Sequence, residues 1–213
     1  MTRRLPIFAL PGVVLMPETL LPLHIFEPRY RAMVADALNG DRTIGMALMK
    51  PGWEDGGKDP DIFAVGGAGE IVESEKLSDG RYNIVLQGRF RYRILREAGV
   101  DPYRQANVEP IASIPFPDAA AEARAAATLG RLFEAVREEL SLPPLPDDAP
   151  GAERLSSELA LRLRYEPAEL QELLETDALP ARCEALAARL RDWSGRMRLL
   201  APYRPKEMDP GRN

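Results

Sequence analysis

The sequence predicts an α+β fold in which a β-rich half precedes a helical half. Short apolar runs broken by glycine and proline fill the first half, which is typical of strands. The second half repeats apolar residues at spacings of three and four, which is typical of helices that bury one face. Because strands and helices are segregated, the pattern favours α+β over an alternating α/β fold. We place the boundary between residues 1–111 and residues 112–213.

In the first half we expect a mostly antiparallel set of strands, one at each apolar run, at residues 5–10, 13–15, 20–24, 43–49, 65–74, 82–98 and 104–111. The segment 50–61, KPGWEDGGKDPD, is rich in glycine, proline and aspartate and therefore predicts an exposed loop. Gly66, Gly67 and Gly69 lie within one expected strand, where glycine indicates a bulge or a close approach of two backbones.

One helix is expected within the β-rich half. Pro28 suits a first helical turn, and apolar residues from Phe26 to Leu38 recur at helical spacing. The pair Asn39-Gly40 would end this helix.

Four helices are expected in the second half, over residues 118–140, 155–165, 167–175 and 179–200, with a proline-rich connector at 141–151. The last is the most regular, and its apolar stripe consists of Leu179, Cys183, Leu186, Leu190, Trp193, Met197 and Leu200. We favour the core face of a helical bundle over a coiled-coil seam, because the stripe is barely three heptads long.

The composition limits the chemistry of the chain. Its net charge of −5 lacks the basic excess of a general nucleic-acid binder. A single cysteine, Cys183, excludes an intrachain disulfide and fits a reducing compartment. Together with a single histidine, His24, it cannot build the usual four-ligand zinc site. We therefore expect a cytoplasmic protein without a metal or cofactor.

The N-terminal segment is apolar but does not predict a membrane segment. Pro6, Pro11 and Pro17 interrupt any helix there, and an uninterrupted apolar run of about 18 residues is missing. We expect neither a signal peptide nor a membrane span.

Catalytic motifs are incomplete. The segment from Gly52 to Lys58 matches the first seven positions of a P-loop, but Asp59 replaces the required Ser or Thr. The four lysines, which a Ser–Lys dyad would need, all lie in loop-like or polar stretches. His24 lies between Leu23 and Ile25 at a strand end, which favours a hydrogen-bonded structural histidine. We therefore predict no catalytic residues and no enzyme.

Arginines alternate with apolar residues in RFRYRILR. On a strand, this period of two places Arg89, Arg91 and Arg93 on one face. Such a row could bind an acidic peptide or a phosphate backbone, although a solvated outer face of a half-buried strand is the simpler interpretation.

The segment LPLHIFEPRYR, from Leu21 to Arg31, resembles the signature of the Lon protease N-terminal, substrate-binding domain family. The segments DGRYNIVLQGRFRYRI at 79–94 and LQELLETDALPARCEALAARL at 170–190 are also similar to that family, as is the pair Pro102-Tyr103. The resemblance implies a PUA-like pseudo-barrel followed by a helical bundle. It also implies recognition of protein substrates, often unfolded. Because an intact P-loop and a Ser–Lys dyad are missing from this sequence, we expect a stand-alone module without the ATPase and peptidase parts of Lon.

Physical chemistry suggests that this signature serves folding more than ligand contact. Glu27 would satisfy free N–H groups of the helix that starts at Pro28. Phe26 and Tyr30 are four residues apart and would pack on one helix face. The candidate binding residues are nonetheless His24, Phe26 and Tyr30 of the signature, together with the arginine row.

Three functions remain open. The first is non-catalytic binding of polypeptides, alone or as an adaptor to a protease or chaperone, with an exposed apolar groove expected where the barrel meets the bundle. The second is RNA binding through the PUA-like fold and the arginine row. The third is an enzyme, which rests only on analogy of fold.

Overall fold

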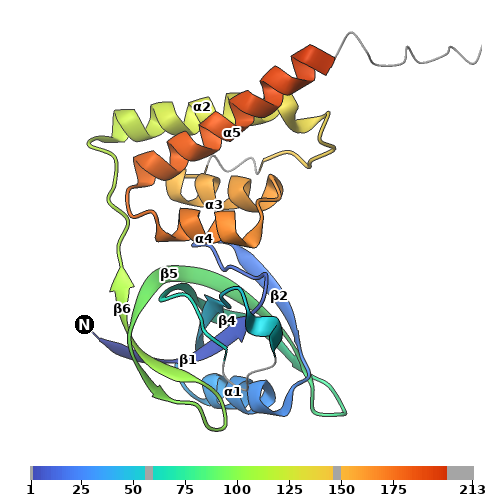
Figure 1. The fold of residues 1–213 in the computed structure, drawn as a ribbon, viewed down its shortest axis with the longest axis vertical. Coiled ribbons are helices and arrows are strands. Elements are labelled where there is room, and N and C mark those ends of the chain that lie inside the picture. Colours follow the sequence, from blue (N-terminus) through green and yellow to red (C-terminus); the bar gives the residue numbers. More distant parts are fainter. Residues whose placement is uncertain (1, 56–59, 146–149, 201–213) are drawn as a thin grey trace, which may run out of the picture.

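The computed structural model describes residues 2–55, 60–145 and 150–200, and they form the expected α+β fold (Figure 1). The strands are β1 (Arg3–Leu10), β2 (Leu20–Ile25), β3 (Thr43–Leu48), β4 (Val65–Lys76), β5 (Tyr82–Gly99) and β6 (Gln105–Ile111). The α-helices are α1 (Pro28–Asn39), α2 (Ala119–Arg137), α3 (Ala152–Arg162), α4 (Pro167–Glu175) and α5 (Leu179–Leu200). A short 3₁₀ helix, η1, covers Trp53–Asp55.

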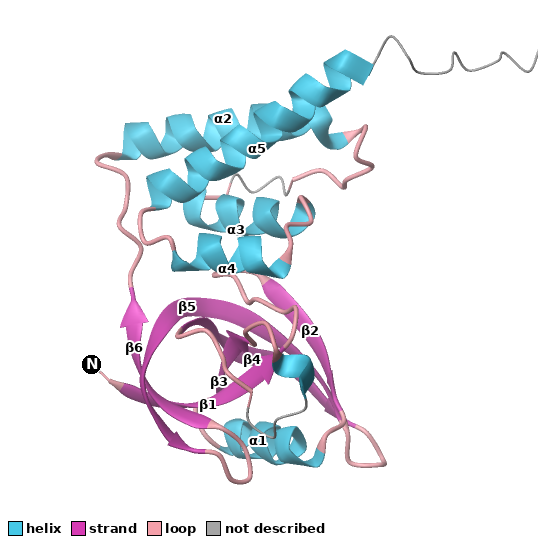
Figure 2. Ribbon diagram, viewed as in Figure 1, coloured by secondary structure: helices cyan, strands magenta, loops and turns pink. Residues whose placement is uncertain are grey.

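The six strands form one mixed sheet in the order β2-β5-β4-β3-β1-β6. Only β1 and β3 are parallel, and the other pairings are antiparallel. Because β6 also pairs with β5, the strands β1, β3, β4, β5 and β6 close into a ring (Figure 2). The long strand β5 makes this possible, since residues 82–87 pair with β2 and residues 91–99 pair with β6. Strand β2 is therefore left at the edge of the sheet.

Helices lie on opposite sides of the strand ring. Helix α1 lies on one side, and α2 to α5 stack on the other, with α4 nearest the strands (Figures 1 and 2). One apolar core runs from the ring into the helices, because Val14, Met16 and Val65 belong to the same buried cluster as the helical leucines. The side-chain amide of Gln171 on α4 adds a hydrogen bond of 2.9 Å to the carbonyl oxygen of Val65.

The apolar stripe of α5 is the core face of the helical region. Leu179, Cys183, Leu186 and Leu190 are all buried there, and Trp193 is partly buried. This confirms the interpretation of the stripe as a packing face.

The expected strand at residues 13–15 is wrong. Residues 13–16 are irregular and cross the strand ring close to its glycines. A Cβ atom on Gly67 would collide with the carbonyl oxygen of Leu15, and one on Gly88 would collide with that of Met16. The close backbone approach expected at Gly67 is thus confirmed. Val14 and Leu15 are apolar because their side chains are buried in the core, and not because they pair with a neighbouring strand.

The expected start of α1 also needs correction. The helix begins at Pro28, and the side chain of Phe26 precedes it and is 61% exposed, so Phe26 does not pack on the helix with Tyr30. The Glu27 carboxylate does not cap the helix. It accepts a hydrogen bond of 3.0 Å from the Arg29 guanidinium instead. Proline at the first position has no N–H to cap, which removes part of the need for a capping side chain.

Several expectations concern residues outside the described ranges, among them Lys58, Asp59, Lys206 and residues 146–149 of the connector. Within the described ranges, the helices are too short or too polar to cross a membrane.

Candidate functional site

Strand β2 and the residue that follows it present an apolar row to solvent. The exposed residues alternate along the segment as Leu20, Pro22, His24 and Phe26, whereas Ile25 is buried. Leu20 and Phe26 are each 61% exposed. The solvent face of an antiparallel strand is normally polar, so this row is exceptional. The LPLHIFEPRYR signature therefore places Pro22, His24 and Phe26 on the surface.

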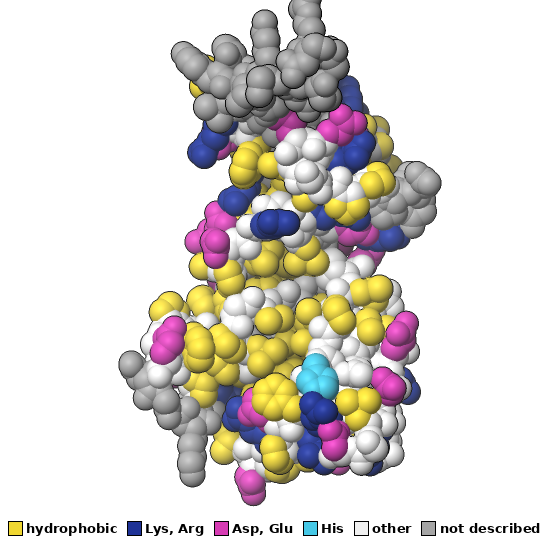
Figure 3. Space-filling view, turned by 90° about the vertical axis from the view of Figure 1, so that its right-hand side faces the viewer, with side chains coloured by type: hydrophobic (Ala, Val, Ile, Leu, Met, Phe, Trp, Pro, Cys, Tyr) yellow, Lys and Arg dark blue, Asp and Glu magenta, His cyan; other side chains and the backbone are white. Residues whose placement is uncertain are grey.

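The molecular face that contains β2 is largely apolar. Hydrophobic side chains cover the middle of this face and extend toward the helices, while charged side chains gather below the histidine (Figure 3). Hydrophobic side chains are thus exposed near the junction of strands and helices, where an apolar groove was expected, and they continue toward the histidine of β2.

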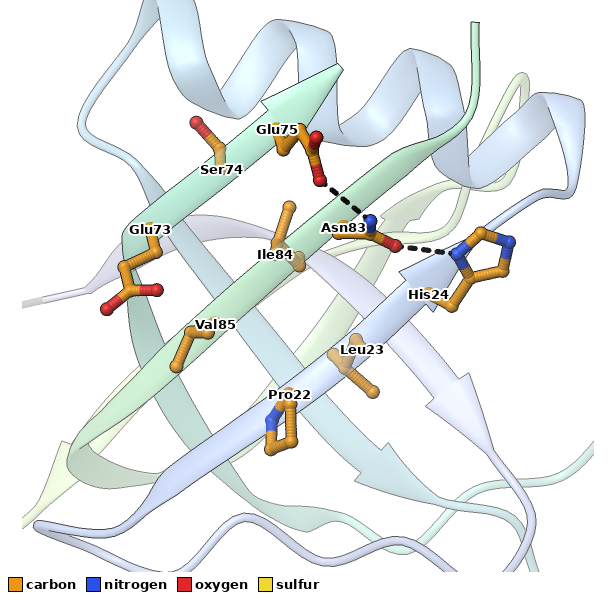
Figure 4. Close-up of a pocket in the computed structure, with 9 residues that line it drawn as sticks. All are labelled: Pro22, Leu23, His24, Glu73, Ser74, Glu75, Asn83, Ile84 and Val85. Atoms are coloured by element: carbon orange, nitrogen blue, oxygen red, sulfur yellow. Dashed lines mark hydrogen bonds between the residues drawn. The ribbon is translucent and has the colours of Figure 1, made fainter. Parts of the chain in front are cut away.

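His24 is held by a chain of hydrogen bonds across three strands (Figure 4). Its Nδ1 lies 2.7 Å from Oδ1 of Asn83 on β5, and the Asn83 amide donates a bond of 2.9 Å to Glu75 on β4. Because the Asn83 amide nitrogen faces Glu75, its oxygen must accept from His24, so Nδ1 carries the proton. Nε2 of His24 then accepts from the Arg81 guanidinium at 3.2 Å.

The turn before β5 anchors the other end of this chain. Arg81 makes an ion pair of 2.7 Å with Asp79. The backbone N–H of Arg81, and then its guanidinium, lower the pKa of Asp79. Both ring nitrogens of His24 are thus engaged, which confirms the prediction of a hydrogen-bonded histidine, although the ring itself lies at the surface.

A groove of about 500 Å³ lies between the start of α1 and the 3₁₀ helix. Its lining includes Leu10, Pro11, Glu27 and Trp53, and Trp53 is 40% exposed. A second cavity of about 340 Å³ shares Ala9, Arg29, Tyr30, Met49 and Pro60 with it. Glu27, Arg29 and Tyr30 of the signature segment therefore line one depression together with Trp53 and Pro60.

Tyr30 helps to form the base of that groove and is buried. Its hydroxyl donates a hydrogen bond of 3.2 Å to the carbonyl oxygen of Ala9. Its ring packs 4.2 Å from the ring of Phe8, and the Arg29 guanidinium lies 4.4 Å from the ring centroid. Tyr30 thus shapes the groove rather than projecting from it.

The arginine row does not form one exposed face. Arg89 is exposed and makes an ion pair of 2.7 Å with Glu70, and Arg93 is exposed. Arg91, by contrast, is 1% exposed. The expectation of three solvated guanidiniums is therefore wrong at Arg91, because α4 and the segment after β6 cover this part of the strand.

Arg91 joins the strand ring to the helical region. Its guanidinium donates hydrogen bonds to the carbonyl oxygens of Leu174, Thr176 and Ala112 at 2.8, 3.2 and 3.2 Å, and to the Asp177 carboxylate at 3.1 Å. Burial, and to a lesser degree the nearby Arg182, lower the pKa of Arg91, and Asp177 opposes this shift. The residue is thus a structural bridge at the C-terminus of α4, where free carbonyl groups favour a cation.

The described residues contain no group of three or more His, Cys, Asp or Glu side chains that could hold a metal ion. Cys183 is free and buried among the helices, where burial raises the pKa of its thiol to about 11.

The structure therefore brings His24 and Phe26 together, with ring centroids 6.3 Å apart, and places Tyr30 in the lining of the groove instead. Leu20 and Pro22 belong to the β2 row, and Trp53 lines the groove; the sequence analysis selected none of these three. The segment from Leu20 to Phe26 is apolar at every position except His24, so the sequence does not show which face of the strand is exposed, while Trp53 is a tryptophan in a loop predicted to be exposed.

Comparisons with known proteins agree with this architecture. The family model described as the ATP-dependent protease La (LON) substrate-binding domain matches residues 4–192. The Lon protease of Cytophaga hutchinsonii is 30% identical over 181 residues, which cover 81% of this chain and 22% of that protein. The Lon protease of Syntrophomonas wolfei is 27% identical over 197 residues, covering 87% and 24%. The chain thus spans no more than about a quarter of the length of these relatives.

Two solved structures share the fold. A Lon N-terminal domain protein from Xanthomonas campestris is 24% identical with a TM-score of 0.63, and the match covers 87% of this chain and 98% of that one. The N-terminal domain of Lon protease from Mycobacterium avium complex is 16% identical with a TM-score of 0.64, covering 91% and 98%. Since the family model spans most of the sequence, this chain belongs to the Lon substrate-binding domain family.

Proposed function

We propose that the apolar face along β2 binds unfolded or extended polypeptides. The carrying observation is the exposed row of Leu20, Pro22, His24 and Phe26, which lies on β2 and the residue that follows it. A contiguous exposed apolar surface on a small protein typically marks an interaction site. Membership of a family described as substrate-binding supports the same ligand class.

RNA binding has no comparable support. It relied on three guanidiniums in a row, and Arg91 is buried while Arg89 is paired with Glu70. A phosphate backbone needs several accessible cations, so polypeptide remains the favoured ligand.

We further propose that binding occurs without chemistry on the ligand, and that the module delivers polypeptides to a protease or chaperone partner in the cytoplasm. The histidine has both ring nitrogens engaged. The thiol of Cys183 is buried, and its raised pKa of about 11 disfavours the reactive thiolate at neutral pH. Neither side chain is therefore set up as a base or nucleophile.

The direct test is a fluorescence anisotropy titration of a labelled, permanently unfolded polypeptide. The variant Leu20→Ser/Phe26→Ser removes two exposed apolar side chains from the row. Each side chain that is buried by a ligand contributes on the order of 1.5–3 kcal/mol, so binding should weaken at least about tenfold.

Leu95→Ser is a matched control, because Leu95 is 53% exposed on the part of β5 that pairs with β6. It should bind as the unchanged protein does. Equal affinities for the row variant and the control, or an unchanged protein that does not bind the polypeptide, would rule out the proposed site.

A further inference from the structure

Strand β2 has one paired edge and one open edge. The carbonyl oxygen of Thr19 accepts from the N–H of Gly88 at 2.8 Å, so Thr19 bonds directly to the partner strand β5. In an antiparallel ladder, bonded and non-bonded pairs alternate. With the observed register, Leu21, Leu23 and Ile25 then bond to β5. The N–H and C=O groups of Leu20 and His24, and the C=O of Pro22, point outward.

The position of the proline agrees with this alternation of residues that bond to β5 and residues that point outward. Pro22 has no N–H and is tolerated in a sheet where that group would face away from the neighbouring strand. Within residues 2–55, 60–145 and 150–200, hydrogen bonds to the outward main-chain groups of Leu20, Pro22 and His24 are not found. Three of the four residues of the apolar row, Leu20, Pro22 and His24, therefore also carry the unpaired edge.

A second copy of the chain is a poor occupant of the edge. If two β2 strands paired about a two-fold axis at Pro22, the two prolines would face each other, and neither could donate at the centre of the ladder. Proline on an edge strand is a known means of preventing such self-pairing. When a different chain pairs with β2, only the N–H at Pro22 is missing from the ladder. The main-chain N–H and C=O groups of Leu20 and His24 are still available to it.

We propose that an extended polypeptide segment adds to the sheet as a new strand along the outer edge of β2. Its main chain bonds to Leu20 and His24, and every second side chain lies beside the apolar row. Main-chain hydrogen bonds do not depend on the sequence of the bound segment. Contacts with the apolar row favour segments in which every second residue is apolar. This inference rests on the proposed polypeptide ligand and adds its conformation and its binding mode.

The first test measures amide hydrogen exchange by NMR, without any substitution in the protein. The probe is a peptide of alternating valine and threonine, about six residues long with a lysine at each end. In the free protein, the amides of Leu20 and His24 should exchange quickly, and saturating peptide should slow them at least about tenfold. The amides of Leu21 and Leu23 bond to β5 and are the internal control, because they should be protected in both states.

The second test changes only the peptide. N-methylation of its backbone removes the donors that a strand needs and also adds apolar surface. Strand addition predicts a loss of affinity of at least about tenfold, whereas docking by side chains alone predicts equal or tighter binding. Tight binding of the methylated peptide, or unprotected amides at Leu20 and His24 in the peptide complex, would overturn strand addition and leave the proposed function standing. If neither peptide bound and the unfolded polypeptide also failed to bind, the proposed function would fail too.

Discussion

Arg91 of β5 donates a hydrogen bond of 2.8 Å to the carbonyl oxygen of Leu174, the second-last residue of α4. This single contact links a strand of the ring to a helix 83 residues further along the chain. Together with the bonds to Thr176 and Ala112, it holds the helical region against the ring.

We therefore expect Arg91→Met to destabilise the protein. The substitution leaves buried carbonyl groups without a donor, and hydrogen bonds to a charged group contribute about 1.5–3 kcal/mol each. A loss of about 2–4 kcal/mol in the free energy of unfolding should appear in urea titrations. Arg93→Met is the control, since Arg93 is exposed on the same strand, and it should change stability by less than about 0.5 kcal/mol. Equal effects of the two substitutions would contradict the role of Arg91 as a bridge.

The strand glycines should respond to alanine in the opposite sense to a helical glycine. Gly67→Ala would place a Cβ against the backbone of Leu15, which cannot yield as a flexible side chain can. We expect a loss of at least about 1–3 kcal/mol, as for other overpacked sites. Gly130 lies within α2 with open space around it, so Gly130→Ala should stabilise by about 0.5–1 kcal/mol. Thermal unfolding of both variants measures the two signs, and stabilisation by Gly67→Ala would be inconsistent with the packing of residues 13–16.

The buried thiol predicts a dependence of stability on alkaline pH. Burial raises the pKa of Cys183 from 9.0 to about 11. The folded state therefore favours the neutral thiol, and its contribution is complete below pH 9 and is lost as the pH rises through about 11. The loss is at most on the order of 2–3 kcal/mol. Urea titrations at pH 8 and pH 10.5 should show a smaller decrease for Cys183→Ala than for the unchanged protein. Equal decreases in the free energy of unfolding for the two proteins would mean that other groups, such as the tyrosines, dominate the loss of stability at alkaline pH.

Pro22→Ala should change association rather than folding. The new N–H faces outward, so the bonds to β5 persist. The unfolded chain gains freedom, which costs about 0.4–1 kcal/mol of stability. The central hydrogen bonds of a two-fold ladder between two β2 strands could then form. We therefore expect a larger, concentration-dependent fraction of dimers for Pro22→Ala than for the unchanged protein in sedimentation experiments. Pro60→Ala, which changes a proline outside the sheet, is the control. Identical sedimentation of both variants would argue against Pro22 as a barrier to self-pairing.

The local pattern of the sequence determined most of the elements and the family. Period-two runs, Pro28 and the Gly/Pro-rich breaks placed the six strands and α1, because side-chain spacing and backbone propensity are local properties. The spacing of the stripe from Leu179 to Leu190 likewise indicates a buried helix face, although it does not indicate which helices pack against that face.

Tertiary structure decided which faces are covered. Arg89, Arg91 and Arg93 have the same period, yet only Arg91 is buried, because α4 packs over that point of β5. Val14 and Leu15 are apolar like strand residues, yet they fill the end of the ring. The open edge of β2 follows from β5 being long enough to pair with β6 as well. Burial depends on segments distant in the chain, so local spacing predicts a face but not its partner.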